Sequence, residues 1–297
     1  MKTAKLKTIV AVTLLASITL LVLSLFASAA DQEPNKAAPK PASNVEDLRA
    51  GKNFITTKVY SAEEDQKALK LFEGLRVSDV TDGMDKAGLR NIGVMSPDIH
   101  PAWKDTVHYE HRFVGIALTA RYVPTNKPPP PIMETKAFDS WMGNWYDKLS
   151  SEPFVPLIRK GTAIVLDDAP DSDVGSIGSN NIMVWKSAGC VGVVTNATAR
   201  DTDEIATEKA PLYFKKVGRG VRPGRNEIES VNRPIVCGGV IVEPGDVIVA
   251  DGEGVIVVPR AYAEEVAEYA RATLKTDKQS RLDIYKKLGL PPDDSVK

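Results

Sequence analysis

The sequence predicts an α/β domain with a mixed sheet, and two observations lead to that class. β-branched runs at 162–166 and 191–195 flank a helical segment, which is typical of the strand–helix–strand crossover that joins parallel strands. Residues 234–259 instead separate short apolar runs by Gly-Gly, Pro-Gly-Asp and Asp-Gly-Glu-Gly turns, which indicates an antiparallel meander. Strands of both orientations, followed by a helical C-terminal stretch, predict one compact domain.

The first thirty residues have the pattern of a secretory signal peptide. Three lysines among the first seven residues precede an apolar run over 9–26, and the small residues Ala27-Ser28-Ala29 follow it. The run is close to a membrane-spanning length, so an uncleaved anchor stays open as an alternative to cleavage. In both cases we expect the protein to be exported, either to the periplasm or out of the cell.

Composition divides the rest of the chain. Residues 31–60 are rich in Pro, Ala, Lys and Asp and predict a flexible linker, residues 61–290 form the domain, and residues 291–297 form a C-terminal tail. The net charge is −1, with both signs interspersed, so we expect no nucleic-acid partner, and no membrane contact beyond an N-terminal anchor. Cys190 and Cys237 stand in apolar runs, which favours two buried free thiols and leaves one disulfide as the alternative.

Three segments precede the crossover. Apolar residues at helical spacing predict two helices within 64–90, the second capped by Ser78 or Asp79 and ended by Gly88. Residues 113–123 predict a buried strand.

Residues 127–150 open with prolines and continue as a short aromatic helix. Its residues Trp141, Trp145 and Tyr146 either line the mouth of a pocket or pack on the core. After the meander, a helix over 262–274 and a second short helix over 281–288 complete the chain.

Residues 174–201 carry the candidate site. A glycine-bearing turn, a helix over 180–188 and the strand over 191–195 lead to the pair Arg200-Asp201. The crossover places the turn and this pair at one edge of the sheet, where ligands of open α/β sheets bind. The backbone amides of the turn suit a carboxylate, and Asp201 suits a divalent metal. The alternative is that Asp201 only caps the helix that follows.

A second possible metal site involves two histidines. His108 and His111 lie three residues apart, a spacing that can place both on one face of a helix. A solvated loop is the favoured alternative.

The order of these segments resembles the RraA-like family (regulator of ribonuclease activity A), which includes class II 4-hydroxy-4-methyl-2-oxoglutarate aldolases. The resemblance covers about residues 65–290 and rests on SDVTDGMDKAGL, KGTAIVLDD, VTNATARD and CGGVIVEPGDVIVADGEGVIVVP. It identifies a divergent member, exported according to its N-terminal pattern, and implies a swivelling β/β/α fold assembled as a homotrimer. Such proteins cleave 4-hydroxy-2-oxo acids to pyruvate, or decarboxylate oxaloacetate, with Mg²⁺ or Mn²⁺.

The resemblance also assigns roles to residues of this chain. Arg200 and Asp201 match the Arg-Asp of the family's active-site signature, so they are the expected catalytic residues, with Asp201 as the metal ligand. The expected substrate-binding residues are Gly178, Ser179, Asn180, Asn181 and Arg200. Ser179 stands where the signature has an acid, and a serine cannot act as a carboxylate base.

The serine leaves two possibilities open. Asp171 or Asp173, in the same loop, could supply the missing acid. Alternatively, the protein binds or regulates a partner without catalysis, as the family's namesake inhibits ribonuclease E.

Overall fold

The computed structural model describes residues 45–168, 173–293 and 295–296, and the chain divides into two units, Met1–Phe54 and Ile55–Lys297. In the first unit, helix α2 (Val45–Ala50) is exposed and lies within the stretch expected to be a linker. The expected signal peptide and the first part of the linker lie outside the described residues. Within the described ranges, no helix combines the length and the apolarity needed to cross a bilayer.

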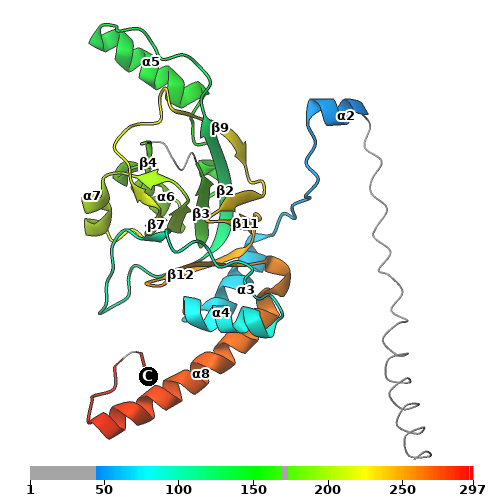
Figure 1. The fold of residues 1–297 in the computed structure, drawn as a ribbon, viewed down its shortest axis with the longest axis vertical. Coiled ribbons are helices and arrows are strands. Elements are labelled where there is room, and N and C mark those ends of the chain that lie inside the picture. The colour runs from blue at the N-terminus through cyan, green and yellow to red at the C-terminus, as the bar shows by residue number, and fades with distance from the viewer. Residues whose placement is uncertain (1–44, 169–172, 294, 297) are drawn as a thin grey trace, which may run out of the picture. The chain divides into compact units, whose positions relative to one another are not determined.

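The second unit is built on a mixed sheet, which confirms the predicted α/β class (Figure 1). The strands run in the order β1 (His100–Pro101), β7 (Leu212–Phe214), β5 (Cys190–Thr195), β3 (Thr162–Asp167), β2 (Phe113–Pro124), β12 (Val247–Asp251) and β13 (Gly254–Val258), and β9 (Asn226–Val231) also pairs with β2. Three adjacent pairings in it are parallel, β2 with β3, β3 with β5 and β5 with β7, while β12 joins β2 antiparallel.

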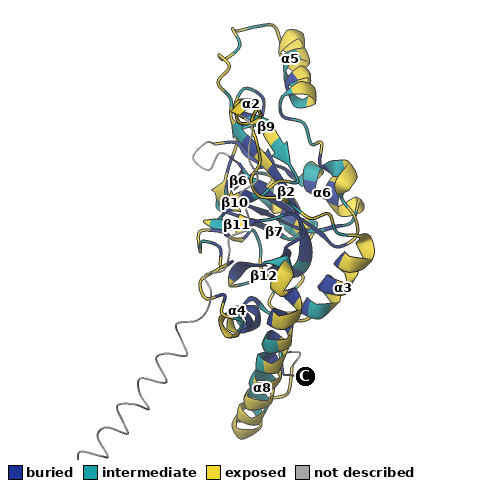
Figure 2. Ribbon diagram, turned by 90° about the vertical axis from the view of Figure 1, so that its right-hand side faces the viewer, coloured by how far each residue is buried: buried dark blue, intermediate teal, exposed yellow. Residues whose placement is uncertain are grey.

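Helices gather at different ends of this sheet. Figure 1 shows α3 (Ala62–Phe72), α4 (Val77–Lys86) and α8 (Ala263–Leu288) beside β12, and α5 (Thr135–Lys148) at the other end. Phe72, Val80 and Val266 are completely buried where the first three helices meet the sheet. Helix α6 (Ser179–Ser187) buries Ile182 and Trp185 against the core that includes β3 and β5. Figure 2 shows α5 as the most exposed of these helices.

Two small sheets complete the unit. Three short parallel strands form one of them, β4 (Gly175–Ile177), β6 (Thr198–Ala199) and β8 (Lys216–Val217). The other is the hairpin of β10 (Ile235–Cys237) and β11 (Val240–Val242). The remaining helices are short: α7 (Thr202–Thr207) and the two 3₁₀ helices η1 (Val155–Leu157) and η2 (Arg260–Tyr262).

Residues 234–259 are two hairpins in different sheets rather than the single meander expected. The chain leaves β11 at a turn around Gly245, whose backbone φ is +95°. The amide of Gly245 donates to the carbonyl of Ala117, and the amide of Ala117 donates to the carbonyl of Asp246. The turn therefore pairs with β2 instead of returning along β11, and β12 enters the main sheet.

Two helix predictions are wrong in their boundaries. The helices expected at 262–274 and 281–288 are one continuous helix, α8, because no Gly or Pro interrupts it before Gly289, which has φ 66°. Helix α4 begins at Val77, with Arg76 as its N-cap. Asp79 is buried and accepts from the Arg76 amide at 3.0 Å, so it lies in the first turn rather than at the cap. Cys190 and Cys237 are free and buried, as favoured.

Candidate functional site

The predicted loop and the Arg-Asp pair meet at the end of the small parallel sheet. β4 pairs with β6 through Gly175 with Thr198 and Ile177 with Ala199. The amide of Arg200 then donates to the carbonyl of Ile177 at 2.8 Å, which extends the pairing by one residue. Because the strands are parallel, their carboxyl ends lie together. The loop and the Arg-Asp pair were predicted to meet because of the crossover in the main sheet. In the structure, the strands of the small sheet bring them into direct contact.

Two glycines allow the pair to lie directly on the loop. A Cβ placed on Gly175 would lie 2.8 Å from the Arg200 Cβ. A Cβ placed on Gly178 would lie 2.6 Å from Oδ2 of Asp201. Both distances are shorter than atoms of this kind tolerate, so the close approach of Arg200 and Asp201 depends on glycine at these two positions.

The carboxylate of Asp201 turns back toward helix α6. Asp201 is the N-cap residue of α7 but makes no side-chain capping bond there, and its backbone is left-handed, with φ 56° and ψ 38°. Its Oδ2 accepts from the Ser179 amide at 3.3 Å and lies 3.6 Å from Nε of Arg200. The structure therefore does not show the capping role that was the alternative for this residue.

The four loop residues expected to bind substrate differ in their surroundings. The amide of Gly178 donates to Oδ1 of Asn181 at 3.2 Å, and Nδ2 of Asn181 donates to Glu152 at 2.6 Å. Ser179 offers its amide to Asp201, while Asn180 is exposed. Side-chain hydrogen bonds thus fix the first turn of α6 at Asn181, and the amide of Ser179 is directed at the carboxylate beside it.

A cavity of about 420 Å³ adjoins this loop. Of the predicted residues, Arg200 and Asn181 line it. The described residues that line it are mostly polar: Tyr146, Asp147, Ser150, Ser151, Glu152, Gly175, Ser176, Asn181, Arg200 and Arg222.

No sequence pattern indicated a second arginine in the cavity. Arg222 is only 6% exposed and forms an ion pair with Glu152. Its guanidinium also donates to the hydroxyl of Tyr122 at 3.0 Å and to the carbonyl of Ser150 at 3.1 Å. Glu152 accepts in addition from Nε1 of Trp185 at 2.9 Å, so it links α6, the loop after α5 and Arg222.

A buried carboxylate lies behind the cavity. Asp168 is 2% exposed and accepts from Nδ2 of Asn226 at 2.9 and 3.0 Å. The hydroxyl of Ser176, which lines the cavity, also donates to Asp168. Asp168 belongs to the segment KGTAIVLDD on which the family resemblance rests, but no role was predicted for it. Its partner Asn226 is 58 residues away, and no local pattern reveals such a pair.

The aromatic residues of α5 divide between the two roles considered for them. Tyr146 lines the cavity. Trp145 is 4% exposed, and its Nε1 donates to the carbonyl of Asn226 at 3.0 Å. Trp141 packs against Trp145 with ring centres 5.5 Å apart. The helix therefore anchors itself through tryptophan and presents tyrosine to the cavity.

Other candidate ligands lie elsewhere or are engaged. His108 and His111 lie in turns rather than on a helix, and His111 is buried, with Nδ1 accepting from the Asp105 amide at 3.1 Å. Asp173 is paired with Arg219, while Asp171 lies outside the described residues. No group of three or more His, Cys, Asp or Glu in the described part of the chain is arranged to hold a metal.

Comparison with known proteins identifies the family. The family model named RraA-like, described as Aldolase/RraA, matches residues 77–257. The chain belongs to the RraA-like family. Its swivelling β/β/α fold was predicted from the resemblance, and solved structures of RraA proteins share it.

Two curated relatives illustrate how far the sequence of this chain has diverged. A protein of Halalkalibacterium halodurans named "Putative 4-hydroxy-4-methyl-2-oxoglutarate aldolase" is 31% identical over 112 residues, which is 37% of this chain and 52% of that protein. Protein DlpA of Legionella pneumophila is 26% identical over 217 residues, 70% of this chain and 30% of DlpA. The chain thus spans about half, or less, of the length of these relatives.

Two solved structures match the fold over more of its length. An uncharacterised protein of Pseudomonas syringae is 24% identical, with a TM-score of 0.59, over 80% of this chain and 97% of that one. Streptomyces coelicolor RraAS2, described as an unusual member of the RNase ES inhibitor RraA protein family, is 17% identical, with a TM-score of 0.60, over 74% and 98%. Identities this low demonstrate a shared fold alone.

Proposed function

We propose that this RraA-like protein is a divalent-metal-dependent lyase. It cleaves small 4-hydroxy-2-oxo acids such as 4-hydroxy-4-methyl-2-oxoglutarate, or decarboxylates oxaloacetate, through the enolate of pyruvate. The observation that carries the proposal is the carboxylate of Asp201. It lies 3.3 Å from the Ser179 amide and 3.6 Å from Nε of Arg200, beside a polar cavity. Curated relatives named as aldolases support the same reaction class.

The donor chemistry of this carboxylate fits Mg²⁺ or Mn²⁺. The Asp201 side chain is 37% exposed, and its contacts with the Ser179 amide and with Arg200 leave lone pairs for a hard cation. Magnesium is commonly held by one or two carboxylates together with waters and substrate oxygens, so one protein carboxylate is a sufficient anchor. When bound, such a cation supplies Lewis acidity that stabilises negative charge on the ketone oxygen.

The chain's own residues orient the substrate. The Arg200 side chain lines the cavity, and its planar fork of donors matches a carboxylate or a developing oxyanion. The amide of Ser179, in the first turn of α6, is directed at the Asp201 carboxylate beside the cavity, and the N-terminus of a helix favours negative charge. Ser179 can donate or accept a hydrogen bond but cannot take up a proton as a carboxylate does.

Assembly and location are further parts of the proposal. We expect a homotrimer in the periplasm or outside the cell, supported by the family membership and by the signal-like N-terminus. The Arg200 and Asp201 side chains are more than a third exposed in one copy, which leaves space for a neighbouring subunit. Light scattering of the purified protein would test the assembly, and the mass of the secreted chain would test removal of residues 1–30.

The deciding experiment measures pyruvate release from oxaloacetate and from 4-hydroxy-4-methyl-2-oxoglutarate. Each substrate is assayed with Mg²⁺, with Mn²⁺ and with a chelator, for the native protein and for Arg200→Ala and Asp201→Asn. We expect release that requires metal and that both substitutions greatly reduce. Release unaffected by the chelator or by both substitutions would refute the assignment of the site.

Ser179 favours a second candidate function. Without an acid at this position, the same cavity can bind a small anion or regulate a partner with no turnover. Folded protein that releases no pyruvate under any metal condition, yet still binds 2-oxo acids in calorimetry, would favour this function over the lyase.

A further inference from the structure

One wall of the cavity comes from a single stretch of chain. Tyr146 and Asp147 lie in the last turn of helix α5, and Ser150, Ser151 and Glu152 follow the helix. We call these five residues the α5 wall. Arg200, the expected partner of the substrate's carboxylate, does not belong to this stretch, because it follows β6. The α5 wall is therefore the part of the cavity that can select the remainder of the substrate.

The cation beside the α5 wall is already neutralised. Arg222 is buried, and its guanidinium donates to Glu152, to the hydroxyl of Tyr122 and to the carbonyl of Ser150. The rings of Tyr122 and Tyr146 lie 5.5 and 5.4 Å from its central carbon. A buried arginine with these contacts is bound into the fold, and its charge is compensated by Glu152. It does not offer a second carboxylate the unpaired cation that Arg200 offers the first.

The α5 wall also carries an uncompensated negative charge. Asp147 lines the cavity, is exposed, and forms no ion pair with any residue that the structure describes. Asp147, Glu152 and Arg222 together give this region a formal charge of −1. A second carboxylate on the substrate would be repelled by Asp147, since like charges placed together at a binding site disfavour a ligand.

The remaining groups of the α5 wall suit hydroxyls. The hydroxyls of Tyr146 and Ser151 form no side-chain hydrogen bond with the described residues, and Asp147 is an acceptor. The Ser150 hydroxyl, in contrast, is used, because it donates to Oδ1 of Asn226 at 2.9 Å. Hydroxyl and carboxylate side chains together can donate to and accept from the hydroxyls of a polyol.

From this wall we infer that the substrate is a monocarboxylic 4-hydroxy-2-oxo acid whose tail beyond C4 is uncharged and hydroxylated. This inference rests on the proposed lyase function. In the reaction, the C3–C4 bond breaks and its electron pair stays on C3 as the pyruvate enolate. The C4 hydroxyl loses its proton and becomes the carbonyl of a hydroxylated aldehyde, and C3 gains a proton to give pyruvate.

The test compares three substrates on the purified protein with Mg²⁺ or Mn²⁺. 4,5,6-Trihydroxy-2-oxohexanoate represents the hydroxylated class, and 4-hydroxy-4-methyl-2-oxoglutarate and oxaloacetate represent the dicarboxylates. We expect kcat/KM for the trihydroxy acid to exceed that for either dicarboxylate by about tenfold or more, the ratio that 1.4 kcal/mol produces. A dicarboxylate preferred over the trihydroxy acid, or equal rates for the two classes, would overturn the inference and leave the lyase proposal standing.

Reversing the charge of the α5 wall sharpens the test. Asp147→Lys should raise kcat/KM for the dicarboxylates about tenfold, mainly through KM, and lower it for the trihydroxy acid. Asp139→Lys is the matched control, because Asp139 is exposed on the same helix and does not line the cavity. The same change in both variants would show a general effect of charge and would count against the inference.

A binding measurement separates failure of this inference from failure of the lyase proposal. If no substrate yields pyruvate, the lyase proposal fails, and calorimetry then compares the trihydroxy acid with 2-oxoglutarate. Tighter binding of the trihydroxy acid, reversed by Asp147→Lys, would support the selectivity of the α5 wall on its own. Tighter binding of 2-oxoglutarate, or binding of neither acid, would overturn it.

Discussion

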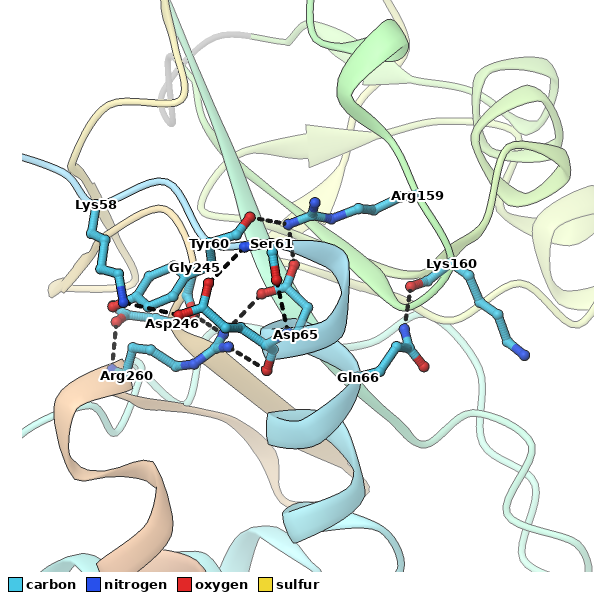
Figure 3. Close-up of polar contacts among 11 residues, drawn as sticks. Lys58, Tyr60, Ser61, Asp65, Gln66, Arg159, Lys160, Gly245, Asp246 and Arg260 are labelled. Carbon is cyan, nitrogen blue, oxygen red and sulfur yellow. Dashed lines mark hydrogen bonds and ion pairs between the residues drawn. The ribbon is translucent and has the colours of Figure 1, made fainter.

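Two aspartates of this protein, Asp65 and Asp201, each lie beside arginine, but in very different surroundings. Asp65 is 4% exposed and accepts from both Arg159 and Arg260, the latter at 3.1 Å (Figure 3). Asp201 has a side chain that is 37% exposed and lies 3.6 Å from Arg200. The first carboxylate is held by close charged contacts, whereas the second keeps most of its capacity for a ligand.

The arginines around Asp65 are equally committed to the fold. Arg159 also donates to the carbonyl of Tyr60 at 2.9 Å, and Arg260 donates to the carbonyls of Glu64 and Gly245. The Tyr60 ring lies 4.3 Å from the central carbon of Arg260. Asp65 thus connects α3 with the chain before β3 and with η2. Burial and the number of partners, rather than residue type, therefore distinguish a structural ion pair from one that is available for chemistry.

Loss of the buried pair should produce the largest change in stability. Asp65→Ala leaves Arg260, whose side chain is 10% exposed, without its carboxylate, so the free energy of unfolding should fall by about 3 kcal/mol or more. Lys67→Ala on the same helix is the control. Its pair with Glu264 is 74% exposed on both sides, so its loss should cost less than about 1 kcal/mol. Denaturant unfolding measures both, and equal effects would refute the distinction.

Asp201→Asn should instead lower activity strongly and change stability little. We expect pyruvate release to fall by a factor of about 10²–10³, the size of loss found when one group of an active site that stabilises the transition state is removed. Stability should change little, because asparagine tolerates the left-handed backbone of this position. The two measurements are made on the same preparation, and a large loss of stability would show that Asp201 is structural.

Gly178→Ala tests the contact between the loop and the carboxylate. The added Cβ would meet Oδ2 of Asp201 at 2.6 Å, and this atom can move because it ends a side chain. We expect activity to fall by about tenfold or more through misplacement of the carboxylate, with a small change in unfolding midpoint. Gly143→Ala, where the added atom meets nothing within 4 Å, should leave activity unchanged.

Ser179→Asp should raise the lyase activity rather than lower it, and by a smaller factor. A carboxylate at this position could accept the proton that serine cannot, so the lyase rate should rise by about tenfold. An unchanged rate would mean that proton transfer does not depend on residue 179.

The smallest expected effect concerns pH and the buried His111. Burial lowers the pKa of His111, and its Nδ1 already accepts from a backbone amide, so the folded state keeps the ring neutral. Below about pH 6.5 the unfolded chain binds a proton that the folded chain does not, so this contribution to stability is present above that pH and is lost as the pH falls toward the folded pKa. Comparing unfolding midpoints at neutral and acidic pH for native protein and His111→Gln checks the sign, because the variant should lose part of the pH dependence.

Sequence patterns predicted the parts of the fold that have periodicity or β-branched runs. The parallel strands β3 and β5 and helix α6 between them were predicted, and so was the approach of Arg200 to the glycine loop. Helix α8 was predicted as two helices with residues 275–280 between them, although nothing in that polar segment excludes a helix.

The cavity itself could not be predicted in the same way. Arg222 and Glu152 lie in irregular segments 70 residues apart, and each acquires its role only through the other. The strands of the small sheet have two or three residues, which is too few for any alternation to be recognised. Their pairing depends on tertiary contacts, such as the approach of Arg200 to Gly175, that no local pattern encodes.

The small sheet has a consequence for how binding can be observed. The strands of the small sheet have only two or three residues, and the backbone hydrogen bonds around Arg200 include those from the Arg200 amide to Ile177, the Gly218 amide to Ala199 and the Gly175 amide to Gly220. Segments with so little pairing open locally at a lower free energy than a central strand such as β3. Deuterium should therefore replace the protons of these three amides early. A ligand that binds the closed site should slow that exchange even where it causes no turnover.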